Sequence, residues 1–142
     1  MNVYFACSIT GGREFEPVYR AITAALLADR HTVPTAHIAG PDVKALEASV
    51  SPREIYARDA AWMRACDALV AEVSTPSHGV GYEVAFALNL GKRVLCLYRV
   101  GQSVSKMITG NPAPNLRVVS YRDAGEAVQT IRAFLNLPSV EL

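Results

Sequence analysis

Two carboxylates stand out in the sequence because each falls on a helical stripe that is otherwise apolar. Those stripes are Glu83, Phe86, Ala87 and Leu90, and Ile55, Asp59, Trp62, Met63 and Cys66. A carboxylate on such a stripe points inward or into a cleft, where it is costly without a partner or a chemical task. Two carboxylates at the edge of one cleft suit glycosyl transfer, in which one acts as acid and the other as nucleophile.

Each of these residues also has a purely structural explanation. A glutamate such as Glu83 in the first turn of a helix stabilises the helix dipole by about 0.3–1 kcal/mol. Asp59 would be satisfied by holding a buried loop amide. Tyr4, near the end of the first predicted strand, either packs in the core or donates its phenol to a cleft carboxylate.

Two loops have residues that expose backbone amides and hydroxyls to a ligand. One covers Cys7–Arg13 and contains Gly11 and Gly12, and the other covers Ser74–Glu83. Each joins a predicted strand to a predicted helix, which is the arrangement of an anion cradle. Neither loop matches the dinucleotide or the triphosphate glycine motif. An ordinary glycine turn remains the alternative for the first loop.

The elements that must position these groups alternate between short apolar strands and helical segments, which is typical of βαβ units. We predict one α/β domain over residues 1–142, with a flavodoxin-like (Rossmann-like) five-stranded parallel sheet flanked by helices. Ligands then bind at the carboxyl ends of the first and third strands, where both loops lie. The predicted strands are Val3–Cys7, His31–Thr35, Ala68–Val73, Arg93–Leu97 and Leu116–Ser120, in the order 2-1-3-4-5. The predicted helices are Phe15–Ala28, Pro52–Cys66, Val80–Leu90 and Ala124–Leu135.

Two helix ends are marked by their residues. Ser51 and Glu54 form a capping box around Pro52, and Gly91 provides a helix stop. Two longer connections remain, at residues 36–50 and 98–115.

Composition narrows the possible partners. The chain has 142 residues and a formal net charge of +1, so no basic field exists to grip a nucleic-acid polymer. No apolar run approaches the roughly 20 residues of a membrane span, and no export signal precedes the first strand. Cys7, Cys66 and Cys96 lack metal or disulfide spacing, and the three histidines suggest no metal site. We therefore expect a cytoplasmic protein with reduced thiols and no metal.

The sequence resembles the 2′-deoxynucleoside 5′-phosphate N-hydrolases, relatives of the nucleoside 2-deoxyribosyltransferases, over most of its length. The motifs that carry the resemblance are Val-Tyr-Phe-x-x-Ser-Ile-x-Gly-Gly-Arg-Glu at Val3–Glu14, Asp59-x-x-Trp62, Ala71-Glu72-Val73 continuing through Pro76-Ser77-x-Gly79-Val80-Gly81-Tyr82-Glu83, and Leu95-Cys96-Leu97. Their combination is far more specific than any one of them.

This resemblance implies hydrolysis of the N-glycosidic bond of a deoxynucleoside 5′-monophosphate without a cofactor. Glu83 would be the nucleophile, Asp59 the acid and Tyr4 the residue that orients the nucleophile. The family is dimeric, so Ser105 would complete the phosphate site of the neighbouring subunit. The implied substrate-binding residues are Cys7, Ser8, Ile9, Thr10, Gly11, Gly12, Arg13, Tyr19, His37, Ser77, Gly79, Ser105, Lys106 and Met107.

The chain departs from the family at two positions of the first loop. Cys7 replaces the usual Gly and Thr10 replaces the usual Arg, so one positive charge is missing from the expected phosphate site. Arg13, Arg99 and Lys106 are candidates to replace that charge.

Three other activities fit the same sequence. They are transfer of the deoxyribosyl group to a second base, hydrolysis of ribonucleotides, and nucleotide sensing without catalysis.

Overall fold

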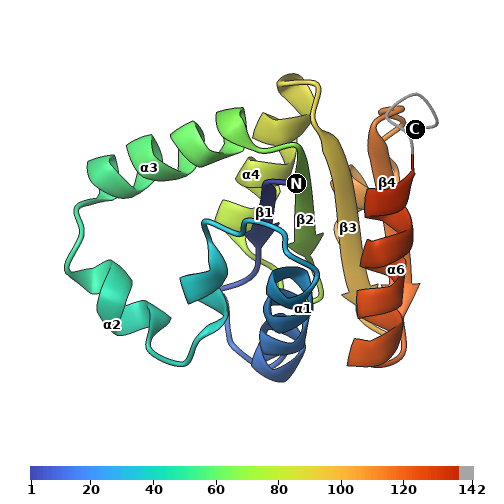
Figure 1. Ribbon diagram of the computed structural model, residues 1–142, viewed down its shortest axis with the longest axis horizontal. Coiled ribbons are helices and arrows are strands. Elements are labelled where there is room, and N and C mark those ends of the chain that lie inside the picture. Colours follow the sequence, from blue (N-terminus) through green and yellow to red (C-terminus); the bar gives the residue numbers. More distant parts are fainter. Residues whose placement is uncertain (138–142) are drawn as a thin grey trace.

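Four parallel strands form the sheet at the centre of the molecule (Figure 1). The computed structural model describes residues 1–137. The strands are β1 (Val3–Ala6), β2 (Ala68–Glu72), β3 (Arg93–Arg99) and β4 (Leu116–Tyr121), and they lie side by side in chain order. All residues of β1 and β2 are buried, as expected for parallel strands that are covered on both faces.

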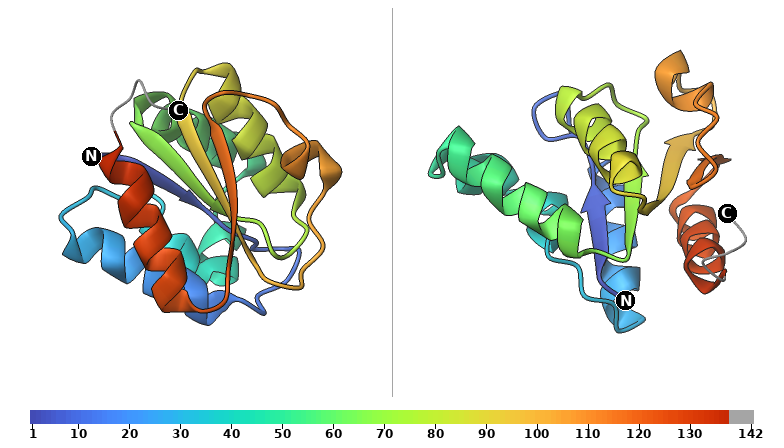
Figure 2. Two further views of the ribbon diagram at one scale, coloured as in Figure 1. Left: turned by 90° about the vertical axis from the view of Figure 1, so that its right-hand side faces the viewer. Right: turned by 90° about the horizontal axis from the view of Figure 1, so that it is seen from above.

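Helices cover both faces of this sheet (Figure 2). Helices α1 (Glu16–Ala28) and α6 (Ala124–Asn136) pack together on one face, and α3 (Pro52–Ala65) and α4 (His78–Asn89) contact each other on the opposite side. Successive strand residues alternate between the faces. Phe5 belongs to the core cluster with α1, and Tyr4 belongs to the cluster with α4. Tyr4 therefore points toward the helices that carry the two candidate carboxylates.

The prediction of a fifth strand at His31–Thr35 was wrong. Only Thr32 pairs with the sheet, through an isolated parallel bridge to Asn2. Pro34 has no amide to donate and disfavours strand pairing. The hydroxyl Oγ1 of Thr35 instead accepts a hydrogen bond from the backbone N of Phe5 at 3.0 Å. The other four predicted strands have the expected neighbours, so the carboxyl ends of β1 and β2 lie side by side.

The two longer connections contain short helices. The first holds η1 (Ala36–Ala39), a 3₁₀ helix, and α2 (Val43–Ala48), and the second holds α5 (Lys106–Thr109). Figure 1 shows α2 and the first half of α3 extending away from the sheet as an arm.

Both predicted helix ends are confirmed. The side chain of Ser51 accepts a hydrogen bond from the backbone N of Glu54 at 3.2 Å, and Glu54 Oε2 accepts one from the backbone N of Ser51 at 3.1 Å. Gly91 follows α4 with a φ of +71°, the left-handed conformation that glycine adopts without strain.

The three cysteines are free thiols, and all three are buried. Within residues 1–137, every helix is too short or too polar to cross a lipid bilayer.

Candidate active site

Tyr4 and Glu83 form the centre of the site. The hydroxyl of Tyr4 donates a hydrogen bond to Oε1 of Glu83, with 2.5 Å between the oxygens. Tyr4 lies on β1 and is 1% exposed, whereas Glu83 lies in the second turn of α4 and is partly buried. Glu83 therefore points inward, as predicted. The hydrogen bond from Tyr4 fixes Oε1, whereas Oε2 has no hydrogen-bond partner within residues 1–137.

The environment of Glu83 makes it a weak acid. Burial raises the pKa of its carboxyl to about 7, and the negative charge of Asp59 acts in the same direction. The hydrogen bond from Tyr4 acts in the opposite direction because it stabilises the carboxylate. Burial and the charge of Glu83 also raise the pKa of Tyr4, so the phenol remains a donor. Glu83 thus changes its charge near neutral pH.

Asp59 faces the same centre from α3. It lies close enough to affect the pKa of Glu83 and of Tyr4 through its charge. Its Oδ1 accepts a hydrogen bond from Nε of Arg58 at 2.8 Å, and its side chain is 20% exposed. The carboxylate is therefore held by an arginine at one oxygen, while Oδ2 has no partner among the described residues.

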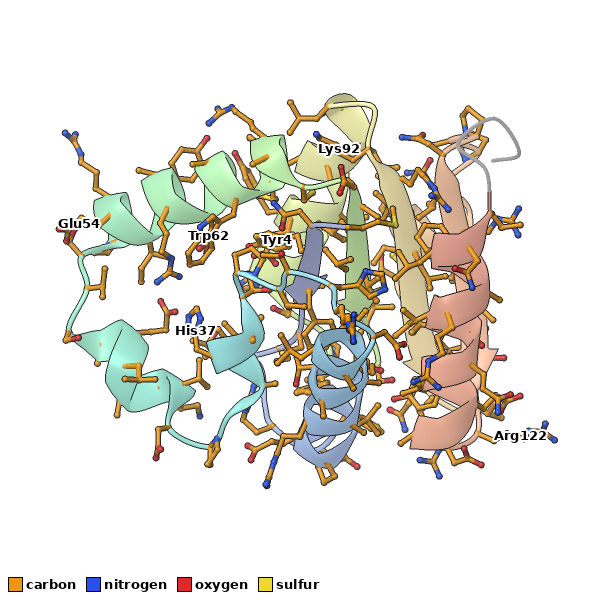
Figure 3. All side chains as sticks on the ribbon, viewed as in Figure 1. Tyr4, His37, Glu54, Trp62, Lys92 and Arg122 are labelled. Atoms are coloured by element: carbon orange, nitrogen blue, oxygen red, sulfur yellow. The ribbon has the colours of Figure 1, made fainter. Side chains whose placement is uncertain are left out.

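Two aromatic rings, one from α3 and one from η1, contact each other edge to face. Trp62 of α3 and His37 of η1 point toward one another, with ring centroids 6.2 Å apart, and Tyr4 lies on the side of this pair that faces the sheet (Figure 3). Nε2 of His37 is 3.0 Å from Oε1 of Glu47. Flat aromatic faces beside two carboxylates offer a stacking surface for a planar base.

The first loop approaches the second very closely. A side chain at Gly11 would place its Cβ 2.3 Å from the carbonyl oxygen of Pro76, so only glycine fits there. Gly12 has a φ of +134°, which also requires glycine. The hydroxyl of Ser8 is buried without a hydrogen-bond partner, and Ile9 beside it is partly buried. The structure thus brings together the two loops predicted to bind an anion.

Arg13 holds the first loop in place. Its guanidinium donates hydrogen bonds to the carbonyl oxygens of Ser8, Ile38 and Gly40 at 3.0, 2.9 and 2.8 Å, and it also contacts the thiol of Cys7. Most of its donors are therefore used within the protein. Burial raises the pKa of Cys7 to about 12, so this thiol is neutral. Cys7 and Arg13 thus stabilise the conformation of the first loop through contacts within the protein.

Tyr19 lies beneath the same loop and is completely buried. The guanidinium of Arg13 lies over its ring, 5.3 Å from the centroid. The residue was predicted to face the substrate, but its side chain has no exposed surface in this arrangement.

A buried carboxyl that had no assigned role lies at the end of β2. Glu72 is 0% exposed, and its Oε1 accepts hydrogen bonds from Ser74 and, at 3.0 Å, from the hydroxyl of Tyr121. Burial raises the pKa of Glu72, although these hydrogen bonds oppose the shift. Oγ of Ser74 also accepts from the backbone N of Arg99 at 2.7 Å. This cluster ties the second loop to β3 and β4.

A groove of about 1030 Å³ runs along a different face of α4 from Glu83. It joins the amino end of α4, where Ser77 caps the helix and Gly79 is exposed, to the segment around α5. Tyr4, Asp59 and Glu83 do not line it. The predicted binding residues that do line it are Thr10, Gly11, Ser77, Ser105, Lys106 and Met107. Arg99 does not line the groove. Among the described residues, Lys106 is the only lysine or arginine that does.

No three potential metal ligands of the His, Cys, Asp and Glu types gather within residues 1–137. The site consists of carboxylates, a phenol, aromatic rings and backbone amides.

The family of the chain follows from its sequence as a whole. The sequence profile of the nucleoside 2-deoxyribosyltransferases matches residues 3–137, so the chain belongs to that family.

Relatives in three organisms show the similarity in more detail. The chain is 41% identical to a 5-hydroxymethyl-dUMP N-hydrolase of Mus musculus over 92% of this chain and 76% of that protein. It is 41% identical over 97% of its length to a protein of Syntrophotalea carbinolica, provisionally named 2′-deoxynucleoside 5′-phosphate N-hydrolase 1, and covers 99% of it. A protein of Methanosarcina mazei with the same provisional name is 41% identical over 95% of this chain and 84% of its own length.

Solved structures support the fold. A CMP N-glycosidase of Clostridium botulinum superposes with a TM-score of 0.69 at 18% identity, covering 93% of this chain and 99% of that one. A 2-deoxyribosyltransferase of Bacillus psychrosaccharolyticus gives a TM-score of 0.60 at 17% identity, covering 90% of each chain. At these identities the likeness shows the Rossmann-like fold alone.

Proposed function

We propose that this protein hydrolyses the N-glycosidic bond of 2′-deoxynucleoside 5′-monophosphates. The observation that carries the proposal is the cluster of Tyr4, Asp59 and Glu83 on the α3 and α4 side of the sheet, in which Tyr4 donates to Glu83 and burial raises the pKa of Glu83 to about 7. The names of the relatives, which specify N-hydrolysis of deoxynucleoside monophosphates, support the same reaction.

Glu83 acts as the nucleophile of the first step. Tyr4 holds Oε1, so Oε2 is the atom that attacks C1′ of the deoxyribose. The bond between C1′ and the base nitrogen breaks, and its electron pair goes to the base, which takes a proton from Asp59. An ester then joins the sugar to Glu83. A deoxyribose favours this route because no 2′-hydroxyl destabilises the positive charge that develops at C1′.

Water completes the reaction. It attacks C1′ and loses a proton to the carboxylate of Asp59, while the ester bond breaks and its electron pair returns to Glu83. The products are the free base and 2-deoxyribose 5-phosphate. Because both steps use carboxyl groups, the chemistry requires neither a metal nor a cofactor.

The 5′-phosphate binds where the two loops meet. Gly11, Gly12 and Ser77 offer backbone amides and a hydroxyl there, at the amino end of α4, and the buried hydroxyl of Ser8 lies beneath Gly11 without a hydrogen-bond partner among the described residues. Lys106 supplies the positive charge in place of the arginine that Thr10 replaces. The base packs against the contacting rings of Trp62 and His37, beside Asp59.

The protein acts as a cytoplasmic homodimer. The groove on α4 is lined by apolar residues, among them Val84, Leu88 and Ile108, as well as by polar ones, and Met107 at its edge is 83% exposed, which suits burial against a second copy. Ser105 lies in this groove and would reach the phosphate site of the partner. Light scattering and activity over a range of protein concentrations test this assignment. A monomer with full activity at every concentration contradicts it.

A panel of deoxyribonucleoside and ribonucleoside monophosphates and the corresponding nucleosides tests the reaction. We expect free base from the deoxynucleoside monophosphates and much less from nucleosides. Release from ribonucleotides at equal rates contradicts the deoxyribose preference. A nucleotide that binds but releases no base in a long incubation indicates a sensor.

Base exchange is the second candidate, because the matching family is named for deoxyribosyl transfer. Adding a free acceptor base to the same assay separates the two reactions. A hydrolase yields 2-deoxyribose 5-phosphate at an unchanged rate, whereas a transferase forms an exchanged nucleotide.

A further inference from the structure

The ion pair between Arg58 and Asp59 belongs to a larger network across the arm of the molecule. Arg58 donates from Nε to Oδ1 of Asp59 at 2.8 Å and from Nη2 to Oε1 of Glu47 at 3.0 Å. The same oxygen of Glu47 lies 3.0 Å from Nε2 of His37. Three elements, η1, α2 and α3, are thus joined by one chain of polar contacts that ends at Asp59.

The guanidinium of Arg58 is fixed from several sides. Residues four apart lie on the same face of a helix, and the guanidinium carbon of Arg58 lies 4.8 Å from the centroid of the Trp62 ring. The planar fork then reaches two carboxylates at once, which a lysine cannot do with the same geometry. Its side chain is 27% exposed. Such a group has little freedom to move once both carboxylates are bound.

Glu47 binds the second nitrogen of the Arg58 guanidinium, Nη2. Burial opposes its ionisation, but the hydrogen bonds from His37 and Arg58 hold the pKa of Glu47 below its ordinary value. Its side chain is 13% exposed, although α2 extends away from the sheet. A charged glutamate on this short helix therefore serves to place the guanidinium rather than to meet solvent.

Asp59 needs such support because it lies near a second carboxyl. Its charge raises the pKa of Glu83, so the two groups repel one another when both are ionised. A carboxylate on a helix also has rotamer freedom, and general acid catalysis requires its oxygen within hydrogen-bond reach of the base. Holding Oδ1 restricts the orientation of the carboxylate and leaves Oδ2 without a hydrogen-bond partner among the described residues.

We propose that Arg58, anchored by Glu47, is a positioning residue that holds Asp59 in the orientation needed to protonate the departing base. This inference rests on the proposed function, and it concerns residues that sequence analysis did not assign. Arg58 acts through Asp59 and contributes nothing further to the chemical step.

A double-mutant cycle tests this role with the deoxynucleoside monophosphate that the wild-type protein hydrolyses fastest. We expect Arg58→Gln to lower kcat by about 30-fold, within the range that general acid catalysis supplies. Asp59→Asn alone should lower kcat at least as much. In the Asp59→Asn background, Arg58→Gln should lower kcat by less than about twofold, because nothing remains to be positioned.

Two further variants isolate the effect. Arg64→Gln makes the same change on the same helix, at a residue that lies over Phe86 and has no carboxylate partner among the described residues. It should leave kcat unchanged. Glu47→Gln removes the anchor without touching the neighbour of Asp59. Glu47→Gln should lower kcat about fivefold, again only when Asp59 is present. If Arg58→Gln does not fold, Glu47→Gln takes its place in the double-mutant cycle.

The proposal is overturned if Arg58→Gln and Glu47→Gln keep more than half of the wild-type kcat, or if their losses are as large without Asp59. Failure of the proposed function looks different, because the wild-type protein would then release no base from any nucleotide.

Discussion

The hydroxyl of Tyr4 donates to Oε1 of Glu83 at 2.5 Å, and this contact connects the first strand to the helix that follows β2. Tyr4 favours the ionised form of Glu83, which is the form that attacks C1′. Burial and Asp59 favour the protonated form, and their combined effect places the pKa of Glu83 at about 7. The proposed nucleophile is therefore sensitive to a single hydrogen bond.

Removing that hydrogen bond should move the pH profile. In the wild-type protein, kcat/KM should fall below about pH 7, because protonated Glu83 cannot attack. Tyr4→Phe removes a donor that stabilises the carboxylate, so the pKa of Glu83 rises and the acidic limb moves up by about one pH unit. Measurement of kcat/KM from pH 5 to 9 checks the shift.

Tyr121→Phe is the matched control. It deletes a buried phenol on β4 that donates to Glu72 instead, so its acidic limb should stay at the wild-type pH. A limb that moves equally in both variants, or in neither, contradicts the assigned role of Tyr4.

Loss of the carboxylate at Glu83 should abolish turnover. Glu83→Gln should lower kcat by several orders of magnitude, because a neutral amide neither forms the ester nor balances the positive charge at C1′. Substrate binding should largely survive, since the carboxylate acts mainly in the transition state. Rapid-quench measurement of base release and a separate binding titration check the two expectations.

A trapped intermediate would identify the nucleophile directly. A slow 2-fluoro-substituted deoxynucleotide should add the mass of a sugar phosphate to the wild-type protein, on the peptide that contains Tyr82 and Glu83. A label on Asp59, or near-normal turnover by Glu83→Gln, would show that another group attacks the sugar.

The periodicity of apolar residues was enough to predict the orientation of Glu83 and Asp59. An isolated charge on an apolar helical stripe must point toward the protein, and both side chains do so. For Tyr4 the sequence left two possibilities, core packing or a hydrogen bond to a cleft carboxylate, and in the structure its phenol donates to Glu83. Four of the five predicted strands are present for the same reason, since each is a short apolar run between helical segments.

The arm that carries Glu47 could not be predicted in this way. Residues 36–50 have no clear periodicity, and the two short helices there depend on contacts with the rest of the molecule. The link from Glu47 to Arg58 joins residues 11 positions apart on different helices, so no helical spacing reveals it. Glu72 did carry a signal, because it is a carboxylate within the buried strand Ala68–Glu72.

Thr10 offers a test of the phosphate site. It is exposed and lines the groove with Ser77 and Ser105. Thr10→Arg should lower KM for a deoxynucleoside monophosphate about tenfold, because a guanidinium binds a phosphate through two charged hydrogen bonds. The KM of the corresponding nucleoside serves as the control and should not change. An unchanged or higher KM for the nucleotide would place the phosphate elsewhere.

The raised pKa of Glu83 should also affect stability. In the unfolded chain this carboxyl ionises near its ordinary pKa of 4.5, but in the folded protein it does so near 7. The folded state therefore binds the proton more tightly, and stability falls as the pH rises from 4.5 to 7. Since one pKa unit corresponds to about 1.4 kcal/mol, the cost reaches about 3 kcal/mol above pH 7.

Glu83→Gln removes this cost, because the amide has no charge to bury and its carbonyl oxygen still accepts from Tyr4. The variant should be more stable than the wild-type protein by about 3 kcal/mol at pH 8 and nearly equal to it at pH 4.5. Urea unfolding at both pH values measures the difference. Glu14→Gln neutralises an exposed carboxylate and should show little change at either pH. If the stability of Glu83→Gln relative to the wild-type protein does not rise between pH 4.5 and 8, the carboxylate of Glu83 is well solvated in the folded protein. The fall of wild-type kcat/KM at acidic pH must then have another origin.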